Sequence, residues 1–243
     1  MRDISCEEIT RTVRDLCIQA NCHLPVDVQE AIVKAEGSER SPVGKAILGD
    51  LEENFRFADA RELPICQDTG MAVVFVELGQ EVHITGGLLS DAVNAGVAQG
   101  YVEGHLRCSV VGDPLRRVNT NNNTPAIIHL TLVEGDRLSI TVAPKGFGSE
   151  NMTALRMLKP SVGPEAVVDF IVEAVSNAGS NPCPPIVVGV GVGGTSEMAT
   201  LLAKRALLRP VDQHNEDPFY ADLEAKALAR INALGIGPQG LGG

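Results

Sequence analysis

The stretch Met71 to Leu78 constrains the fold more than any other part of the sequence. It is an apolar, largely β-branched run bounded by Gly70 and by Gly79-Gln80, which is the pattern of a buried strand. Segments with the 3.6-residue repeat of helices lie before and after it, over about 4–20, 26–35, 43–58 and 87–104. A buried strand among helices predicts a chain that mixes both kinds of element.

The second half of the sequence adds strands and helices. The segments 126–133 and 138–142 flank the four residues 134–137, and this spacing predicts a hairpin. Helical patterns follow at 163–178, 196–208 and 217–234, and 186–190 reads as a strand that feeds a glycine-rich turn. We therefore expect an α/β (mixed α+β) fold over residues 1–243, with a mixed sheet and flanking helices in one large domain or two lobes.

Charge and hydropathy patterning exclude some partners. The net charge of -11 argues against nucleic acid, because binding phosphates requires a basic surface. A small anionic substrate stays open, since a few cations in a cleft can outweigh the overall balance. No apolar run approaches the roughly 18 residues of a membrane span, and the N-terminus is charged where a signal peptide is apolar, so we expect no membrane partner and a cytoplasmic protein.

Six cysteines stand at positions 6, 17, 22, 66, 108 and 183 without a CxxC pair. This pattern indicates a reducing compartment and excludes zinc ribbons, so a metal site would have to gather distant cysteines. Cys66 lies in the turn PICQDTG before the buried strand, and Cys183 lies in NPCPP, where prolines fix the backbone. Each also has a simpler interpretation, as a structural thiol in a capped or proline-stiffened turn.

Residues 189–194 satisfy GxGxxG between the expected strand and helix, and Asp212 follows about 20 residues later, as in dinucleotide sites. Only residues 195–243 follow the motif, and Pro210 interrupts the next strand, so a complete nucleotide fold does not fit. A helix start that binds phosphate or carboxylate remains an alternative.

A further polar stretch contains Arg107, Arg116, Arg117 and the run Asn119 to Thr124. Lone arginines usually lie on the surface in contact with water. Together with Lys145 to Ser149, these residues could instead supply the fork-shaped donors and exposed N–H groups that a dicarboxylate needs.

Several motifs, in the same order, resemble the alpha-type half of class I fumarate hydratases and L(+)-tartrate dehydratases. They are PICQDTG, GDPLRRVNTNNNTPA, KGFGSEN, NPCPPIVVGVGVGGTSE and LGIGPQGLGG, so the likeness covers about residues 5–243. The resemblance implies a hydro-lyase that hydrates fumarate to L-malate, or one that dehydrates L(+)-tartrate. It also implies a paired assembly with a beta-type subunit; a non-catalytic homologue that pairs with other subunits is a further alternative.

The resemblance also implies the site. Three cysteines in that family hold a [4Fe-4S] cluster with one open iron, and Cys66 and Cys183 match two of them. Gln67, Asp68, Arg107 and Gly148 match the residues that bind the dicarboxylate substrate, and Asp68 is the candidate for proton transfer. The third cysteine and a nearby histidine lie beyond the GPQGLGG segment in the family, so we expect this sequence to lack the C-terminal end of the domain.

Overall fold

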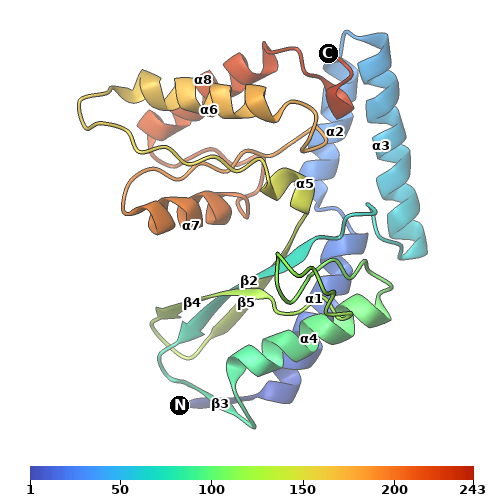
Figure 1. Ribbon diagram of the computed structural model, residues 1–243, viewed down its shortest axis with the longest axis vertical. Coiled ribbons are helices and arrows are strands. Elements are labelled where there is room, and N and C mark those ends of the chain that lie inside the picture. The colour runs from blue at the N-terminus through green and yellow to red at the C-terminus, as the bar shows by residue number, and fades with distance from the viewer. The chain divides into compact units, whose positions relative to one another are not determined.

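The chain folds into two units, each assembled from two separate stretches of the sequence (Figure 1). The computed structural model describes residues 1–243. Unit 1 comprises Met1–Leu24 and Arg56–Phe147, and unit 2 comprises Pro25–Phe55 and Gly148–Gly243. Helices combine with two small sheets, one of which has both parallel and antiparallel strands, so the expected α/β class is confirmed.

The centre of unit 1 is the predicted buried strand, β2 (Met71–Gly79). It is the middle strand of three, between β4 (Ile127–Val133), which runs parallel to it, and β5 (Leu138–Lys145), which runs antiparallel. The predicted β4–β5 hairpin is therefore wrong. The two strands are neighbours in sequence, but β2 lies between them because its apolar side chains gain more burial from two strand neighbours than from one.

The end of β2 fits into the turn that joins β4 to β5. The amide of Gly79 donates to the carbonyl of Arg137 at 2.8 Å, and the amide of Glu81 donates to Gly135 at 2.9 Å. A Cβ atom on Gly79 would lie 2.5 Å from the Gly135 oxygen, which is too close for any side chain. The turn 134–137 thus crosses over the end of β2.

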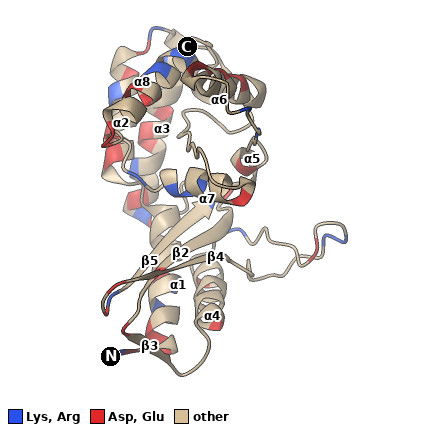
Figure 2. Ribbon diagram, turned by 90° about the vertical axis from the view of Figure 1, so that its left-hand side faces the viewer, with Lys and Arg blue, Asp and Glu red and all other residues tan.

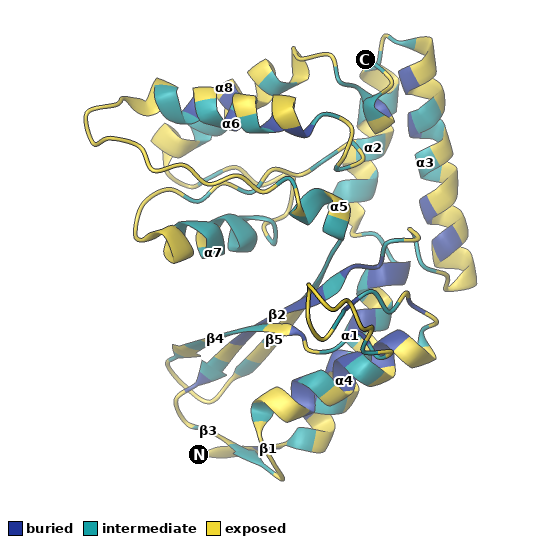
Figure 3. Ribbon diagram, viewed as in Figure 1, coloured by how far each residue is buried: buried dark blue, intermediate teal, exposed yellow.

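Two helices cover this sheet. The helix α1 (Cys6–Cys22) begins at Ser5, whose hydroxyl accepts from the Glu8 amide at 3.1 Å, and it packs against α4 (Leu89–Glu103). Their facing sides form one core with β2 that contains Ile9, Val13, Cys17, Val74, Val76, Val93, Val97 and Tyr101, shown dark blue in Figure 3. A short parallel pair, β1 (Arg2–Ser5) and β3 (Val82–Thr85), was not predicted.

Unit 2 is mainly helical. It contains α2 (Val26–Ser38), most of α3 (Pro42–Arg61), all but the first residue of α5 (Phe147–Glu150), α6 (Pro164–Ala178), α7 (Ser196–Ala206), α8 (Pro218–Asn232) and a 3-10 turn at Pro238–Gly240. The helices α6 and α8 pack through Val168, Ile171 and Ala227. The bounds of α2, α3, α6, α7 and α8 agree with the predicted helices to within a few residues, whereas α5 and the 3-10 turn were not predicted.

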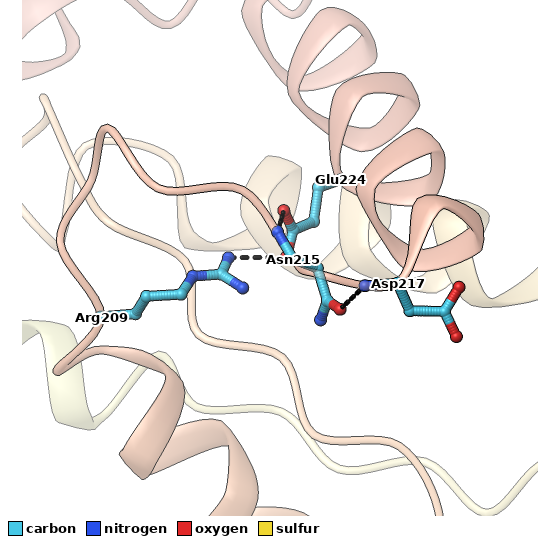
Figure 4. A network of polar contacts seen from close by, with 4 residues as sticks. All are labelled: Arg209, Asn215, Asp217 and Glu224. Carbon is cyan, nitrogen blue, oxygen red and sulfur yellow. Dashed lines mark hydrogen bonds and ion pairs between the residues drawn. The ribbon is translucent and has the colours of Figure 1, made fainter.

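A polar network fixes the segment before α8 (Figure 4). The Glu224 carboxylate on that helix accepts from Arg209 at 2.6 Å and from the Asn215 amide at 3.2 Å. The Asn215 side chain accepts from the Asp217 amide, and Asp217 caps α8 by accepting from the Phe219 amide at 2.9 Å. The helix start predicted at Asp217-Pro218 is confirmed.

The strand expected at 186–190 is wrong. The backbone of Ile186–Gly194 forms no hydrogen bond with the rest of the chain and no ladder with any strand. Gly189 and Gly191 press against α7, because Cβ atoms there would lie 2.2 Å from the Ala203 oxygen and 2.0 Å from the Ala199 oxygen. The alternating glycines are thus explained by close packing on a helix.

Charged side chains are spread over the helices of both units, whereas the three-stranded sheet carries few of them (Figure 2). The loop that contains Asp113, Arg116 and Arg117 carries charges of both signs. The structure contains no helix with the length and hydropathy of a membrane span.

Candidate active site

The turn from Cys66 to Gly70 joins α3 to β2 and carries three of the predicted site residues. Cys66 is exposed; its thiol donates to the Gln67 side-chain oxygen at 3.3 Å and accepts from the Asp68 amide at 3.4 Å. A thiol, an amide and a carboxylate therefore stand on three successive residues of one turn. Hydrogen bonds to sulfur are among the contacts that tune cysteine ligands in metal centres.

Asp68 connects this turn to the end of β5. One carboxylate oxygen accepts from the Gly70 amide at 3.1 Å, and the other accepts from the Phe147 amide at 3.0 Å. The Lys145 to Ser149 motif could have offered its N–H groups to a substrate, but the Phe147 amide donates to Asp68 instead. The carboxylate has lone pairs left for one more partner.

Buried groups hold the turn from behind. Thr69 is 4% exposed, and its hydroxyl accepts from the Arg107 amide at 3.0 Å and lies 3.3 Å from the Arg107 carbonyl. The Tyr101 hydroxyl donates to the Thr69 carbonyl at 2.8 Å, and burial raises the pKa of Tyr101, so this donor stays protonated. These hydrogen bonds fix the backbone of Arg107 beside the turn. Arg107 itself is exposed to solvent.

Asn123 completes the support, and sequence reasoning missed its role. Its side chain is 0% exposed, accepts from the amides of Ser109 at 2.8 Å and Val110 at 3.0 Å, and donates to the Gly70 carbonyl at 2.9 Å. The polar run Asn119 to Thr124 is one that could supply donors to a dicarboxylate, whereas this member faces inward. A run of three asparagines gives no signal for which one is buried.

Cys183 and Gly148, the remaining predicted site residues, belong to unit 2. Cys183 is exposed and has a positive φ of 56°, and its thiol lies 3.9 Å from the Asn181 carbonyl. A Cβ atom on Gly148 would lie 3.2 Å from that same carbonyl, so both predicted residues lie next to Asn181. The backbone amide of Gln239 donates to the Pro184 carbonyl at 2.7 Å, so the motif LGIGPQGLGG lies against the turn that carries Cys183.

Arg116 and Arg117 do not join either group. Their loop is stabilised locally, because the Asp113 carboxylate accepts from the amides of Leu115 at 3.0 Å and Arg116 at 2.7 Å. Both arginines are exposed, in agreement with the simpler interpretation of lone arginines. Of the predicted arginines, Arg107 alone has its backbone bonded to the Cys66 turn.

Comparison with known proteins assigns the chain to a family. A family profile described as Fumarate hydratase (Fumerase) matches residues 10–243. The chain belongs to the fumarate hydratase family. It is 40% identical over 242 residues to the "Putative L(+)-tartrate dehydratase subunit alpha" of Methanocaldococcus jannaschii, covering 97% of this chain and 85% of that protein. It is also 34% identical over 240 residues to the "L(+)-tartrate dehydratase subunit alpha" of an Escherichia coli strain, covering 97% of this chain and 78% of that protein.

The structure of the glycine run at 189–194 gives no support to the dinucleotide alternative. This agrees with membership of the fumarate hydratase family. The strand that GxGxxG requires is not formed, and Gly189 and Gly191 face α7. The start of α7 already holds the Glu197 carboxylate, whose pKa is lowered by a hydrogen bond from Thr195. An anionic phosphate or carboxylate ligand would meet this negative charge.

The other cysteines of this family member differ from Cys66 and Cys183. Cys17 and Cys22 are buried, and burial raises the pKa of Cys17 to about 12. Burial also raises the pKa values of Cys22 and Cys108. Thiolates are the nucleophilic and metal-binding form of cysteine, so these three are poor ligands in this structure. No group of three histidine, cysteine or acidic side chains gathers in metal-binding geometry.

A cavity of about 350 Å³ lies in unit 2, lined by Arg156, Phe170 and Glu173 among others. The Arg156 guanidinium is occupied, since it pairs with Glu173 through contacts of 2.7 and 2.9 Å and stacks on the Phe170 ring at 4.3 Å. None of the predicted site residues lines it, so we place no function there.

Proposed function

We propose that this chain is the alpha-type subunit of a class I hydro-lyase that catalyses the reversible hydration of fumarate to L-malate. It would work with a beta-type subunit and a [4Fe-4S] cluster. The observation that carries the proposal is the Cys66-Gln67-Asp68 turn, in which Cys66 and Gln67 are exposed and Asp68 is half-buried, while Thr69 and Gly70 are anchored in the core. Membership of the fumarate hydratase family supports the reaction class.

The thiols fit the proposed cluster. Cys66 and Cys183 are free and exposed, and soft thiolate ligands are those that select iron–sulfur clusters. The Asp68 amide already points at the Cys66 sulfur, where it would stabilise a thiolate. When bound, the cluster would supply an iron with an open position that acts as a Lewis acid on the substrate hydroxyl. Thiol ligands also require a reducing compartment, which supports a cytoplasmic location.

The predicted substrate-binding residues would hold the dicarboxylate. Arg107 is exposed beside the turn, and its planar guanidinium can bind a carboxylate through two parallel hydrogen bonds. The Gln67 amide can donate to a carboxylate or hydroxyl oxygen, and the backbone of Gly148 can approach substrate closely because it has no side chain. Fixing both ends of the substrate would align its reacting carbons.

Asp68 would move the proton. In the dehydration direction, a carboxylate oxygen of Asp68 takes the proton from the carbon next to a substrate carboxylate, and hydration returns it. The amides of Gly70 and Phe147 orient this carboxylate from two sides. The negative charge that develops on the substrate would be stabilised by the Arg107 guanidinium.

Dehydration of L(+)-tartrate is a second candidate, because the relatives at 33–40% identity are named L(+)-tartrate dehydratase alpha subunits. Tartrate has the same four-carbon dicarboxylate frame, so the same side chains would serve. Comparing the two rates in one preparation discriminates between the candidates.

The test is anaerobic reconstitution of the subunit and its beta-type partner with iron and sulfide. We expect malate from fumarate, or oxaloacetate from L(+)-tartrate, and loss of activity in Cys66→Ser and Cys183→Ser. Cys6→Ser is the matched control, because Cys6 is a half-buried free cysteine outside the site. A loaded complex that turns over neither substrate would refute the proposal.

A further inference from the structure

We propose that Asn123 is a positioning residue that sets the geometry of the Cys66 turn. Its carboxamide connects two segments that are distant in sequence, since Nδ2 donates to the Gly70 carbonyl while Oδ1 accepts from the amides of Ser109 and Val110. Gly70 ends the turn that carries Cys66, Gln67 and Asp68. Ser109 and Val110 follow Arg107, so one side chain holds both predicted substrate-binding segments.

No other side chain fits this position without loss. Asn123 has a positive φ of 59°, a conformation that asparagine tolerates better than most residues. Both ends of its carboxamide are used, and three backbone groups depend on it. The residue is 0% exposed, so water cannot replace a lost partner.

Asn123 is connected to the Cys66 thiol through a short chain of hydrogen bonds. Asn123 fixes the Gly70 carbonyl, and the Gly70 amide donates to Asp68. The Asp68 amide in turn donates to the Cys66 sulfur at 3.4 Å, and the thiol donates to Gln67 at 3.3 Å. Loosening Gly70 should therefore release the Cys66 thiol from these contacts.

The test measures alkylation of individual cysteines by iodoacetamide in the subunit without cluster, using peptide mass spectrometry. Asn123→Gly removes the carboxamide and tolerates the positive φ, so it tests the lost hydrogen bonds without backbone strain. Asn123→Ala removes all three bonds. The matched control is Asn121→Ala. Asn121 is exposed and also has a positive φ, of 64°, but its side chain makes no hydrogen bond.

We expect both Asn123 variants to lower the alkylation rate of Cys66 by about 2- to 10-fold, the equivalent of one net hydrogen bond, because the Asp68 amide no longer stabilises the reactive thiolate. Two thiols in the same molecule serve as references. Cys183 belongs to unit 2 and should be unchanged, and buried Cys17 reports global opening. Asn121→Ala should change none of the three rates.

An unchanged Cys66 rate in Asn123→Gly would overturn the proposal, as would a change of the same size at Cys17, which would mean that Asn123 only stabilises the fold. The catalytic consequence rests on the proposed function. In the reconstituted complex, displacement of the turn should lower kcat/KM by on the order of 100-fold. Absence of turnover in the unmodified complex would refute the proposed function, whereas the alkylation rates test the role of Asn123 without any turnover.

Discussion

Replacing Gly70 by alanine should destabilise unit 1 through a contact that can be separated from backbone strain. Gly70 has a positive φ of 64°, and a Cβ atom there would lie 2.3 Å from the Lys145 carbonyl oxygen. An L-residue in the left-handed region costs about 1–2 kcal/mol. Forcing extra volume into a packed site adds about 1–3 kcal/mol. We expect Gly70→Ala to lower the free energy of unfolding by about 2–5 kcal/mol.

Gly135→Ala is the matched control. Gly135 also has a positive φ, of 89°, but a Cβ atom there would meet nothing within 4 Å. This variant should therefore cost only the strain, about 1–2 kcal/mol. Urea unfolding followed by circular dichroism measures both variants under the same conditions. Equal losses in the two variants would show that the Lys145 contact has no effect and would refute the reasoning.

Three further predictions follow from the buried groups and the glycine run. Tyr101→Phe leaves the Thr69 carbonyl without its donor and should cost about 1–3 kcal/mol in urea unfolding, with little change in fold. Because burial raises the pKa of Cys17 from 9.0 to about 12, its stabilising effect is complete below pH 9 and is lost as pH rises toward 12. Cys17 should therefore contribute about 1.4 kcal/mol to the loss of stability between pH 8 and pH 10, and this loss should be smaller by that amount in Cys17→Ala. In hydrogen exchange of the isolated chain, the amides of Ile186–Gly194 should exchange far faster than those of β2, and slow exchange there would contradict the absence of backbone hydrogen bonds.

The elements that the sequence predicts well are those whose signal is local. The helices follow the 3.6-residue repeat, and β2 follows from an apolar run bounded by glycines. The two wrong predictions depend on distant partners. The hairpin prediction used only the spacing of β4 and β5 and could not include the insertion of β2. The strand predicted at 186–190 has strand composition but no strand neighbour.

The same distinction applies to the site. The motif around Cys66 is visible in the sequence because several unusual residues are contiguous. Of the residues that hold it, Tyr101 lies in a helix and Asn123 is one of three consecutive asparagines, so neither is distinguished by its sequence neighbours. Their burial follows from packing between α4, β2 and the loop before β4, which no periodicity encodes. Sequence reasoning therefore proposed the groups at the surface of the site and missed those beneath them.

The crossing of the turn 134–137 over the end of β2 has a consequence for the order in which the strands pair. The turn 134–137 spans two strand spacings and needs β2 in the middle, yet the pairing closest in sequence is β4 directly with β5. Loop closure between near neighbours is fast, so direct pairing of β4 with β5 should form first and would have to reopen before β2 can insert. On the ribosome, β2 emerges before either neighbour and can template both strands. A chain diluted out of denaturant has no such sequence of events, and should therefore refold more slowly than it folds during synthesis.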